Sequence, residues 1–139
     1  MNNIVNTDKA PEPVGKYPHA RKVGDLLFLS GVGPRKPGTS VIPGVMLDGQ
    51  GNVLGHDIEH QCHSVFENVK IILMESDSHW DNLIDITIFL TNMKRDFDIF
   101  NKVYEEYFQN NQPCRTTVEV SSLPTPIAIE LKCIATIGK

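Results

Sequence analysis

Residues 58–90 read IEHQCHSVFENVKIILMESDSHWDNLIDITIFL, and the apolar spacing changes partway through this stretch. In the first half, apolar residues recur every three to four positions and predict an amphipathic helix. Asp57 is suited to cap its start, and Asp77-Ser78 lie at its expected end. In the second half, apolar and polar residues alternate, which predicts a strand over 83–90. The apolar stripe of the helix comprises Ile58, Cys62, Val65, Phe66, Val69, Ile72 and Leu73.

Further elements flank this helix and strand on both sides. Upstream, residues 20–30 predict a β-hairpin that turns at Gly24-Asp25. Residues 33–52 are rich in proline and glycine and predict a long loop, with one short strand near 45–47. Downstream, helical spacing predicts a second helix over 96–109, followed by strands over 116–120 and 127–137. We expect residues 1–16 to be an irregular lead-in.

This order of elements predicts one α+β domain over residues 1–139, with both helices on one face of a mixed sheet. Along the last strand, Ile129, Leu131 and Cys133 share one face, and Glu130 and Lys132 share the other. The face that the helices leave open needs a partner, so we expect a closed ring or dimer of identical subunits.

The composition narrows the class of protein. The chain has 139 residues and a formal net charge of −4, and this acidic balance argues against nucleic acid as the main ligand. Three cysteines, an odd number without paired spacing, predict no disulfide framework. No apolar run reaches membrane length. We therefore expect a cytoplasmic protein without a membrane partner.

Histidines recur at the start of the first predicted helix. His56, His60 and His63 could share one helix face, but the sequence offers no set of carboxylate or cysteine side chains to complete a metal site with them. A polar helix face is the favoured interpretation, and we expect no metal site.

The last two predicted strands carry one arginine and one glutamate, and we expect these strands to be neighbours. Arg115 offers a planar fork for a carboxylate, and Glu130 can move a proton or orient a water. Such a pair suits hydrolytic chemistry on a small carboxylic acid. The alternative is an ordinary cross-strand ion pair, which contributes little when exposed.

Several blocks of this sequence, in the right order, resemble the reactive intermediate deaminase (Rid/YjgF) family. The strongest is the signature around Arg115 and Glu130, and the others lie across most of the chain. They are Gly15-Lys16-Tyr17-Pro18-His19-Ala20, Leu29-Ser30-Gly31, Asn68, Phe89-Leu90 and the segment through Phe97, Asn101 and Tyr104.

The resemblance implies a homotrimer of the chorismate-mutase-like α+β fold, with sites in the clefts between subunits. It implies hydrolysis of an imine or enamine with release of ammonia and without a metal or organic cofactor. In this sequence Arg115 would clamp the substrate carboxylate, and Glu130 would position or activate water. The pocket would be lined by Tyr17, Ser30, Gly31 and Asn101.

Three departures from the family pattern bear on the substrate. Pro18 follows the tyrosine where a serine is usual, Thr117 replaces a common cysteine, and Cys114 precedes the arginine without an assigned role. The segments that contain these three residues, together with Ser30-Gly31-Val32-Gly33-Pro34-Arg35, resemble the subgroup that acts on 2-aminomuconate.

The 2-aminomuconate subgroup releases 4-oxalocrotonate and ammonia from a dicarboxylate. A second carboxylate in a cleft needs a second cation or several donors. We therefore predict that His19 or Arg35 meets it; the alternative for Arg35 is a solvated loop charge. A general 2-imino acid deaminase and a non-catalytic ligand-binding or stress-linked protein remain the alternatives.

Overall fold

The computed structural model describes residues 3–138, and the chain forms two helices, one short 3-10 helix and eight strands over this range. In chain order the elements are β1 (Ile4–Val5), β2 (Ala20–Val23), β3 (Leu26–Leu29), β4 (Val45–Leu47), β5 (Val53–His56), α1 (Ile58–Glu75), η1 (Trp80–Asn82), β6 (Leu83–Leu90), α2 (Met93–Tyr107), β7 (Cys114–Glu119) and β8 (Ile129–Thr136).

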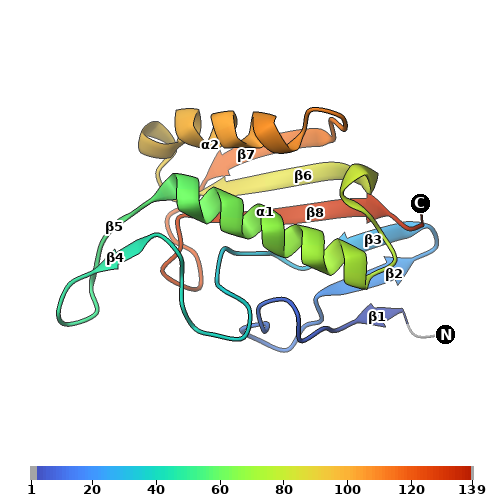
Figure 1. The fold of residues 1–139 in the computed structure, drawn as a ribbon, viewed down its shortest axis with the longest axis horizontal. Helices are drawn as coiled ribbons and strands as arrows, with labels where there is room; N and C mark the ends of the chain where they lie inside the picture. The colour runs from blue at the N-terminus through green and yellow to red at the C-terminus, as the bar shows by residue number, and fades with distance from the viewer. Residues whose placement is uncertain (1–2, 139) are drawn as a thin grey trace.

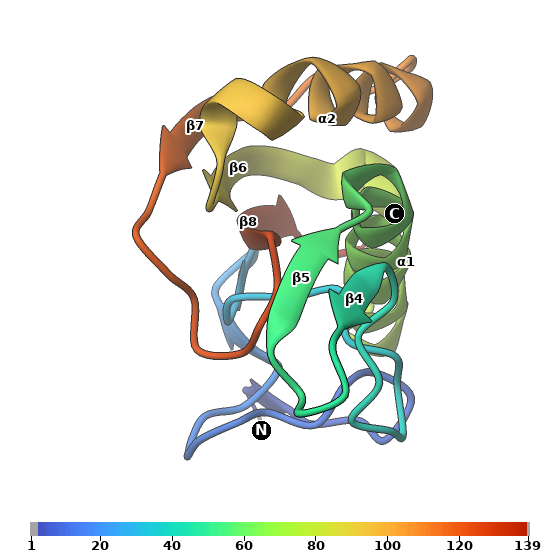
Figure 2. The same ribbon diagram turned by 90° about the vertical axis from the view of Figure 1, so that its left-hand side faces the viewer.

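A six-stranded mixed sheet has the order β1-β2-β3-β8-β6-β7. Among the strands of residues 3–138, only the β6–β7 pair is parallel; the other neighbours are antiparallel. Helix α1 packs on β8 and α2 on β6, and Figures 1 and 2 show both helices on the same side of the sheet. The predicted single α+β domain with two helices on one face of a mixed sheet is confirmed.

The core lies between the sheet and the two helices. Every apolar residue of the predicted stripe on α1 is buried there. Along β8, Ile129, Leu131 and Cys133 are fully buried, whereas Glu130 and Lys132 on the other face are partly exposed. This alternation confirms which residues of β8 share a face. No helix of the described chain covers the second face of the sheet.

Local signals placed several element boundaries correctly. The β2–β3 hairpin turns at Gly24, whose φ of +59° suits a glycine. Asp57 caps α1 by accepting a hydrogen bond from the His60 N–H at 3.2 Å. Helix α2 begins at Met93, three residues earlier than expected, because Asn92 caps it by accepting from the Arg95 N–H at 3.0 Å.

Two short strands lie where the sequence predicted none. Ile4–Val5, inside the expected irregular lead-in, pairs with β2, and Val53–His56 pairs with β4 in a separate two-stranded sheet. Neither is long enough for apolar alternation to stand out from its surroundings. The predicted strand near 45–47 is confirmed as β4.

The expectation that the last two strands are neighbours is wrong. Strand β6 lies between β7 and β8 and pairs with both. Because β6 and β7 run parallel, a crossover through α2 joins them. This arrangement decides where Arg115 and Glu130 point. Within residues 3–138, neither helix is long and apolar enough to cross a membrane.

Candidate active site

A pocket of about 370 Å³ opens at one end of the sheet. This volume lies in the range of about 300–1,000 Å³ that is usual for small-molecule sites. Three segments far apart in the sequence form its walls: Pro11–His19, Ser30–Arg35 and Pro124–Glu130, with Ile72 of α1 behind them. Of the eight predicted site residues, six line the pocket: Tyr17, His19, Ser30, Gly31, Arg35 and Glu130.

Glu130 brings a carboxylate to the pocket from the open face of β8. Partial burial raises its pKa above the usual value. Gly31 lies directly against it: a Cβ at this glycine would come within 2.6 Å of Glu130 Oε2. Gly31 is therefore required for the carboxylate to occupy this position, and a carboxyl group with a raised pKa is suited to transfer protons.

Tyr17 and Ser30, which line the same pocket, are held by hydrogen bonds to the backbone. The Tyr17 hydroxyl accepts a hydrogen bond from the Val14 N–H at 3.2 Å, and the Ser30 hydroxyl donates to the Pro18 carbonyl at 2.7 Å. The hydroxyl of Tyr17 therefore keeps its proton available to a ligand, whereas that of Ser30 keeps acceptor capacity.

His19 and Arg35 differ in how free they are to meet a substrate. His19 is 7% exposed, its Nδ1 accepts from the Thr7 N–H at 3.2 Å, and its Nε2 donates to the Pro11 carbonyl at 2.8 Å. Both ring nitrogens are thus used by the backbone, which requires the neutral imidazole. The guanidinium of Arg35 donates to the Glu12 carbonyl and keeps further N–H groups for a ligand.

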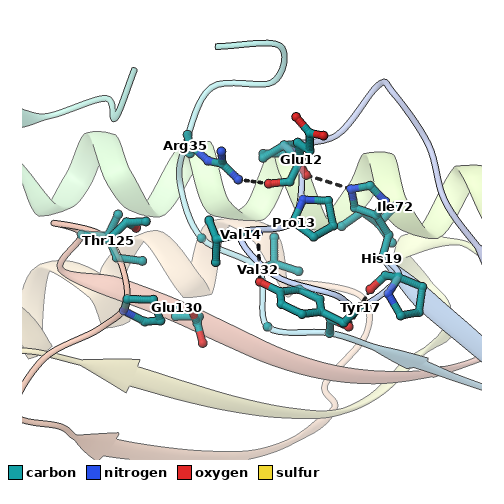
Figure 3. Close-up of a pocket in the computed structure, with 17 residues that line it drawn as sticks. Glu12, Pro13, Val14, Tyr17, His19, Val32, Arg35, Ile72, Thr125 and Glu130 are labelled. Carbon is teal, nitrogen blue, oxygen red and sulfur yellow. Dashed lines mark hydrogen bonds between the residues drawn. The ribbon is translucent and has the colours of Figure 1, made fainter. Parts of the chain in front are cut away.

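Figure 3 shows Arg35 and Glu130 on opposite sides of the pocket, with Val14 between them in this view. The pocket therefore presents an apolar middle, a carboxylate on one side and a cation on the other. Both ring nitrogens of His19 are therefore already bonded, whereas Arg35 keeps N–H groups free for a ligand.

Arg115 and Asn101 lie outside this pocket, on the helix-covered face of the sheet. Arg115 pairs in register with Ile86, which is fully buried under the helices, whereas Glu130 pairs with Phe89, which faces the other side. Within one chain, Arg115 and Glu130 therefore point to opposite faces of the sheet and form neither an ion pair nor a common site. Alternation along a strand predicts which residues share a face, but it cannot relate the faces of two separate strands.

The guanidinium of Arg115 is held in a fixed position under α2. Its Nε donates to Thr117 Oγ1 at 2.9 Å, and an Nη donates to Asn101 Oδ1 at 2.7 Å. Its Cζ lies 4.7 Å from the ring centroid of Tyr104 and 5.0 Å from that of Phe100. Thr117 was not among the predicted site residues; its place two residues after Arg115, on the same face of the strand, was the available signal.

The described part of the chain offers no metal centre. Residues 3–138 contain no group of three or more histidine, cysteine or acidic side chains that could hold an ion. His56 contacts the Gln61 amide and His63 contacts the Tyr107 hydroxyl, so these two histidines serve separate local contacts.

Comparison with known sequences decides the family. The family described as Endoribonuclease L-PSP matches residues 7–137 of this chain. A RutC family protein of Saccharolobus solfataricus is 40% identical over 135 residues, which cover 97% of this chain and 98% of that protein. The chain belongs to the Rid/YjgF family.

Other members of the Rid/YjgF family carry informative names. Reactive Intermediate Deaminase A of Arabidopsis thaliana chloroplasts is 34% identical over 134 residues, which cover 96% of this chain and 65% of that protein. The crystal structure of E. coli TdcF with bound serine superposes with a TM-score of 0.81 at 30% identity, covering 96% of this chain and 97% of that chain.

These comparisons confirm the resemblance and the fold that the sequence motifs indicated. The roles of the individual site residues, the trimer and the substrate stay predictions.

Proposed function

We propose that this protein is a cofactor-free deaminase that hydrolyses the imine or enamine of a small carboxylic acid. The observation that carries the proposal is Glu130: a partly buried carboxyl group with a raised pKa, facing a pocket of substrate size and approached closely by Gly31. The Arabidopsis relative named as a reactive intermediate deaminase supports the same class of reaction.

The chemistry needs few groups. An enamine first tautomerises to its imine, and protonation of the nitrogen makes the carbon of the C=N bond electrophilic. Water adds to that carbon and gives a tetrahedral carbinolamine, which expels ammonia and leaves a carbonyl group. In this proposal Glu130 holds the attacking water and accepts and returns its proton, while a guanidinium fixes the substrate carboxylate.

The two halves of this site require more than one subunit. Glu130 points to the open face of one chain and lines the pocket at one end of the sheet, whereas the Arg115 clamp lies on the helix-covered face. We propose that the chain forms a homotrimer in which the pocket of one subunit meets the Arg115 edge of the next. The apolar surface of the open face supports this assembly; it includes Val23, Leu26, Phe28, Phe89 and Ile134, of which Val23 is 56% and Leu26 37% exposed.

Within this reaction class, we propose 2-aminomuconate as the substrate, with 4-oxalocrotonate and ammonia as products. Its reacting end would lie between Glu130 and the clamp, its chain against the apolar middle of the pocket, and its far carboxylate at Arg35. Buried carboxylates require such a cation, and the planar guanidinium fork can meet one with two hydrogen bonds.

Steady-state ammonia release from freshly generated 2-aminomuconate and from 2-iminopropionate tests both the proposed reaction class and the proposed substrate. We expect turnover of 2-aminomuconate, loss of at least about a hundredfold in kcat/KM with Arg115→Ala or Glu130→Gln, and selective loss on 2-aminomuconate with Arg35→Ala. Equal Arg35→Ala effects on both substrates would reject the dicarboxylate and leave a general 2-imino acid deaminase.

A protein that binds these acids and never releases ammonia would overturn the enzymatic proposal in favour of a ligand-binding protein. The family description as an endoribonuclease is tested alongside, with single-stranded RNA as substrate. We expect no cleavage, because the net charge of −4 gives little attraction for phosphates.

A further inference from the structure

Helix α1 carries two buried amide side chains on its otherwise apolar face. Gln61 is 0% and Asn68 is 3% exposed. They lie seven residues apart, about two helical turns, and therefore on the same side of the helix. A buried amide must find hydrogen-bond partners, and both of these find them in the walls of the pocket.

Asn68 binds the wall that carries Arg35. Its Nδ2 donates one hydrogen bond to the Gly33 carbonyl and one to the Arg35 carbonyl, both at 2.9 Å. The beginning of the same segment is held by β8, because Val32 and Leu131 exchange backbone hydrogen bonds of 2.8 and 2.9 Å. The main chain of residues 31–35 is thus fixed at both ends.

Gln61 binds the opposite wall. Its Oε1 accepts a hydrogen bond from the Ala128 N–H at 2.9 Å, two residues before Glu130. Its Nε2 contacts the ring nitrogen of His56 at 2.9 Å. Helix α1 therefore holds two walls of the pocket through two separate side chains. One wall bears the Arg35 guanidinium and the other bears the Glu130 carboxylate.

We propose that Asn68 is a positioning residue that determines selectivity for substrates with a second carboxylate, because it fixes the main chain from which Arg35 extends. An arginine on a mobile loop would lose conformational freedom on binding, which weakens the complex. With its main chain held by Asn68, and its guanidinium restrained by the Glu12 carbonyl, Arg35 meets the far carboxylate already in place. This inference rests on the proposed function and deepens it.

The test compares Asn68→Ser with Gln61→Met on 2-aminomuconate and on 2-iminopropionate. Asn68→Ser is expected to raise KM for 2-aminomuconate about tenfold, with kcat and the KM for 2-iminopropionate changed by less than about twofold. Gln61→Met, the matched control at the other wall, is expected to lower kcat on both substrates by similar factors. Equal losses on both substrates in Asn68→Ser would overturn the proposal.

A double variant separates an action through Arg35 from a general loosening of the fold. If Asn68 acts through Arg35, then Asn68→Ser adds little to the KM for 2-aminomuconate once Arg35→Gln is present. If the double variant instead raises KM by the product of the two single-variant factors, the proposal is contradicted.

If Asn68→Ser does not fold, Asn68→Gln is the second variant, since it keeps both donors on a longer side chain and displaces the bound carbonyls. The same selective rise in KM is expected, and wild-type values on both substrates would reject the inference.

Binding distinguishes failure of this inference from failure of the proposed function. Muconate and sorbate have the same six-carbon diene chain and differ in having two carboxylates or one, and neither is hydrolysed. Calorimetry is expected to show that the Asn68 variant binds muconate about tenfold more weakly than the wild type and binds sorbate with unchanged affinity. That selective loss supports the role of Asn68 even if the wild type releases no ammonia, whereas parallel changes for both acids overturn it.

Discussion

At the scale of single residues, the site depends on how Glu130 is accommodated. Its carboxylate is partly buried, and none of the hydrogen bonds formed within residues 3–138 reaches it. Burial without such a partner favours the neutral acid, which is why the pKa is raised. This cost to the folded state is what keeps the group ready for proton transfer.

The raised pKa of Glu130 predicts how stability responds to pH. The folded state holds this proton more tightly than the unfolded state, so its contribution to stability is fully present below the unfolded pKa and is lost as pH rises through the folded pKa. Relative to Glu130→Gln, which does not titrate, the wild type should therefore become less stable on going from acidic to neutral pH. Urea unfolding of both proteins across this range measures the difference, and a change of the opposite sign would refute the prediction.

The close contact between Gly31 and Glu130 gives a second prediction. In Gly31→Ala the new Cβ would meet the carboxylate at 2.6 Å, so the Glu130 side chain must move. We expect a fall of about tenfold or more in kcat, because small misplacements of a reacting group are costly. Gly49→Ala is the matched control, since nothing lies within 4 Å of its Cβ position and its backbone conformation suits alanine. Unchanged kcat in Gly31→Ala would show that the position of Glu130 is not critical.

At the scale of elements, α1 connects the core to both walls of the pocket. Its apolar residues fix it to β8, and its amides hold the segments that bear Arg35 and Glu130. The start of the helix lies next to the end of β5 and is set by Asp57. Stability of this one helix therefore bears on the shape of the site.

Removal of the Asp57 cap tests that dependence. Asp57→Ala should lower the free energy of unfolding by about 1 kcal/mol, because the His60 N–H loses its acceptor. Asp57→Asn keeps an acceptor oxygen and should cost less. Urea unfolding at one fixed protein concentration gives both values, since the stability of an assembly depends on concentration. Equal losses in the two variants would mean that the charge of Asp57, and not its hydrogen bond to the His60 N–H, stabilises the helix.

At the scale of the whole molecule, opposite faces of one sheet carry the two halves of the proposed site. A closed ring of three copies would bring each pocket to the Arg115 edge of a neighbour without leaving an unmatched half.

Mixed assemblies test this sharing between subunits. Arg115→Ala and Glu130→Gln are each expected to be inactive, but unfolding them together and refolding an equal mixture should restore activity at about a quarter of the sites, by random assortment. Each variant refolded alone should stay inactive. A mixture as inactive as its components would show that both groups act from the same chain.

The features that could be predicted from the sequence are local or nearly local. The stripe on α1, the alternation on β6 and β8, the turn at Gly24 and the Asp57 cap all depend on neighbours a few residues apart. The motif blocks also named six residues that one pocket then gathers from three distant segments. These features were predictable because period and side-chain chemistry can be read along the chain.

The arrangement of those parts in space required the folded structure. It placed β6 between β7 and β8, turned Arg115 under the helices and Glu130 to the open face, and used both nitrogens of His19 in backbone contacts. Strand order is set by pairing between residues far apart in the chain, and a two-residue period does not say which face meets a helix. Within one chain, the pair read from the sequence as a single site is therefore split between the two faces of one sheet, and the strand pairing is the reason.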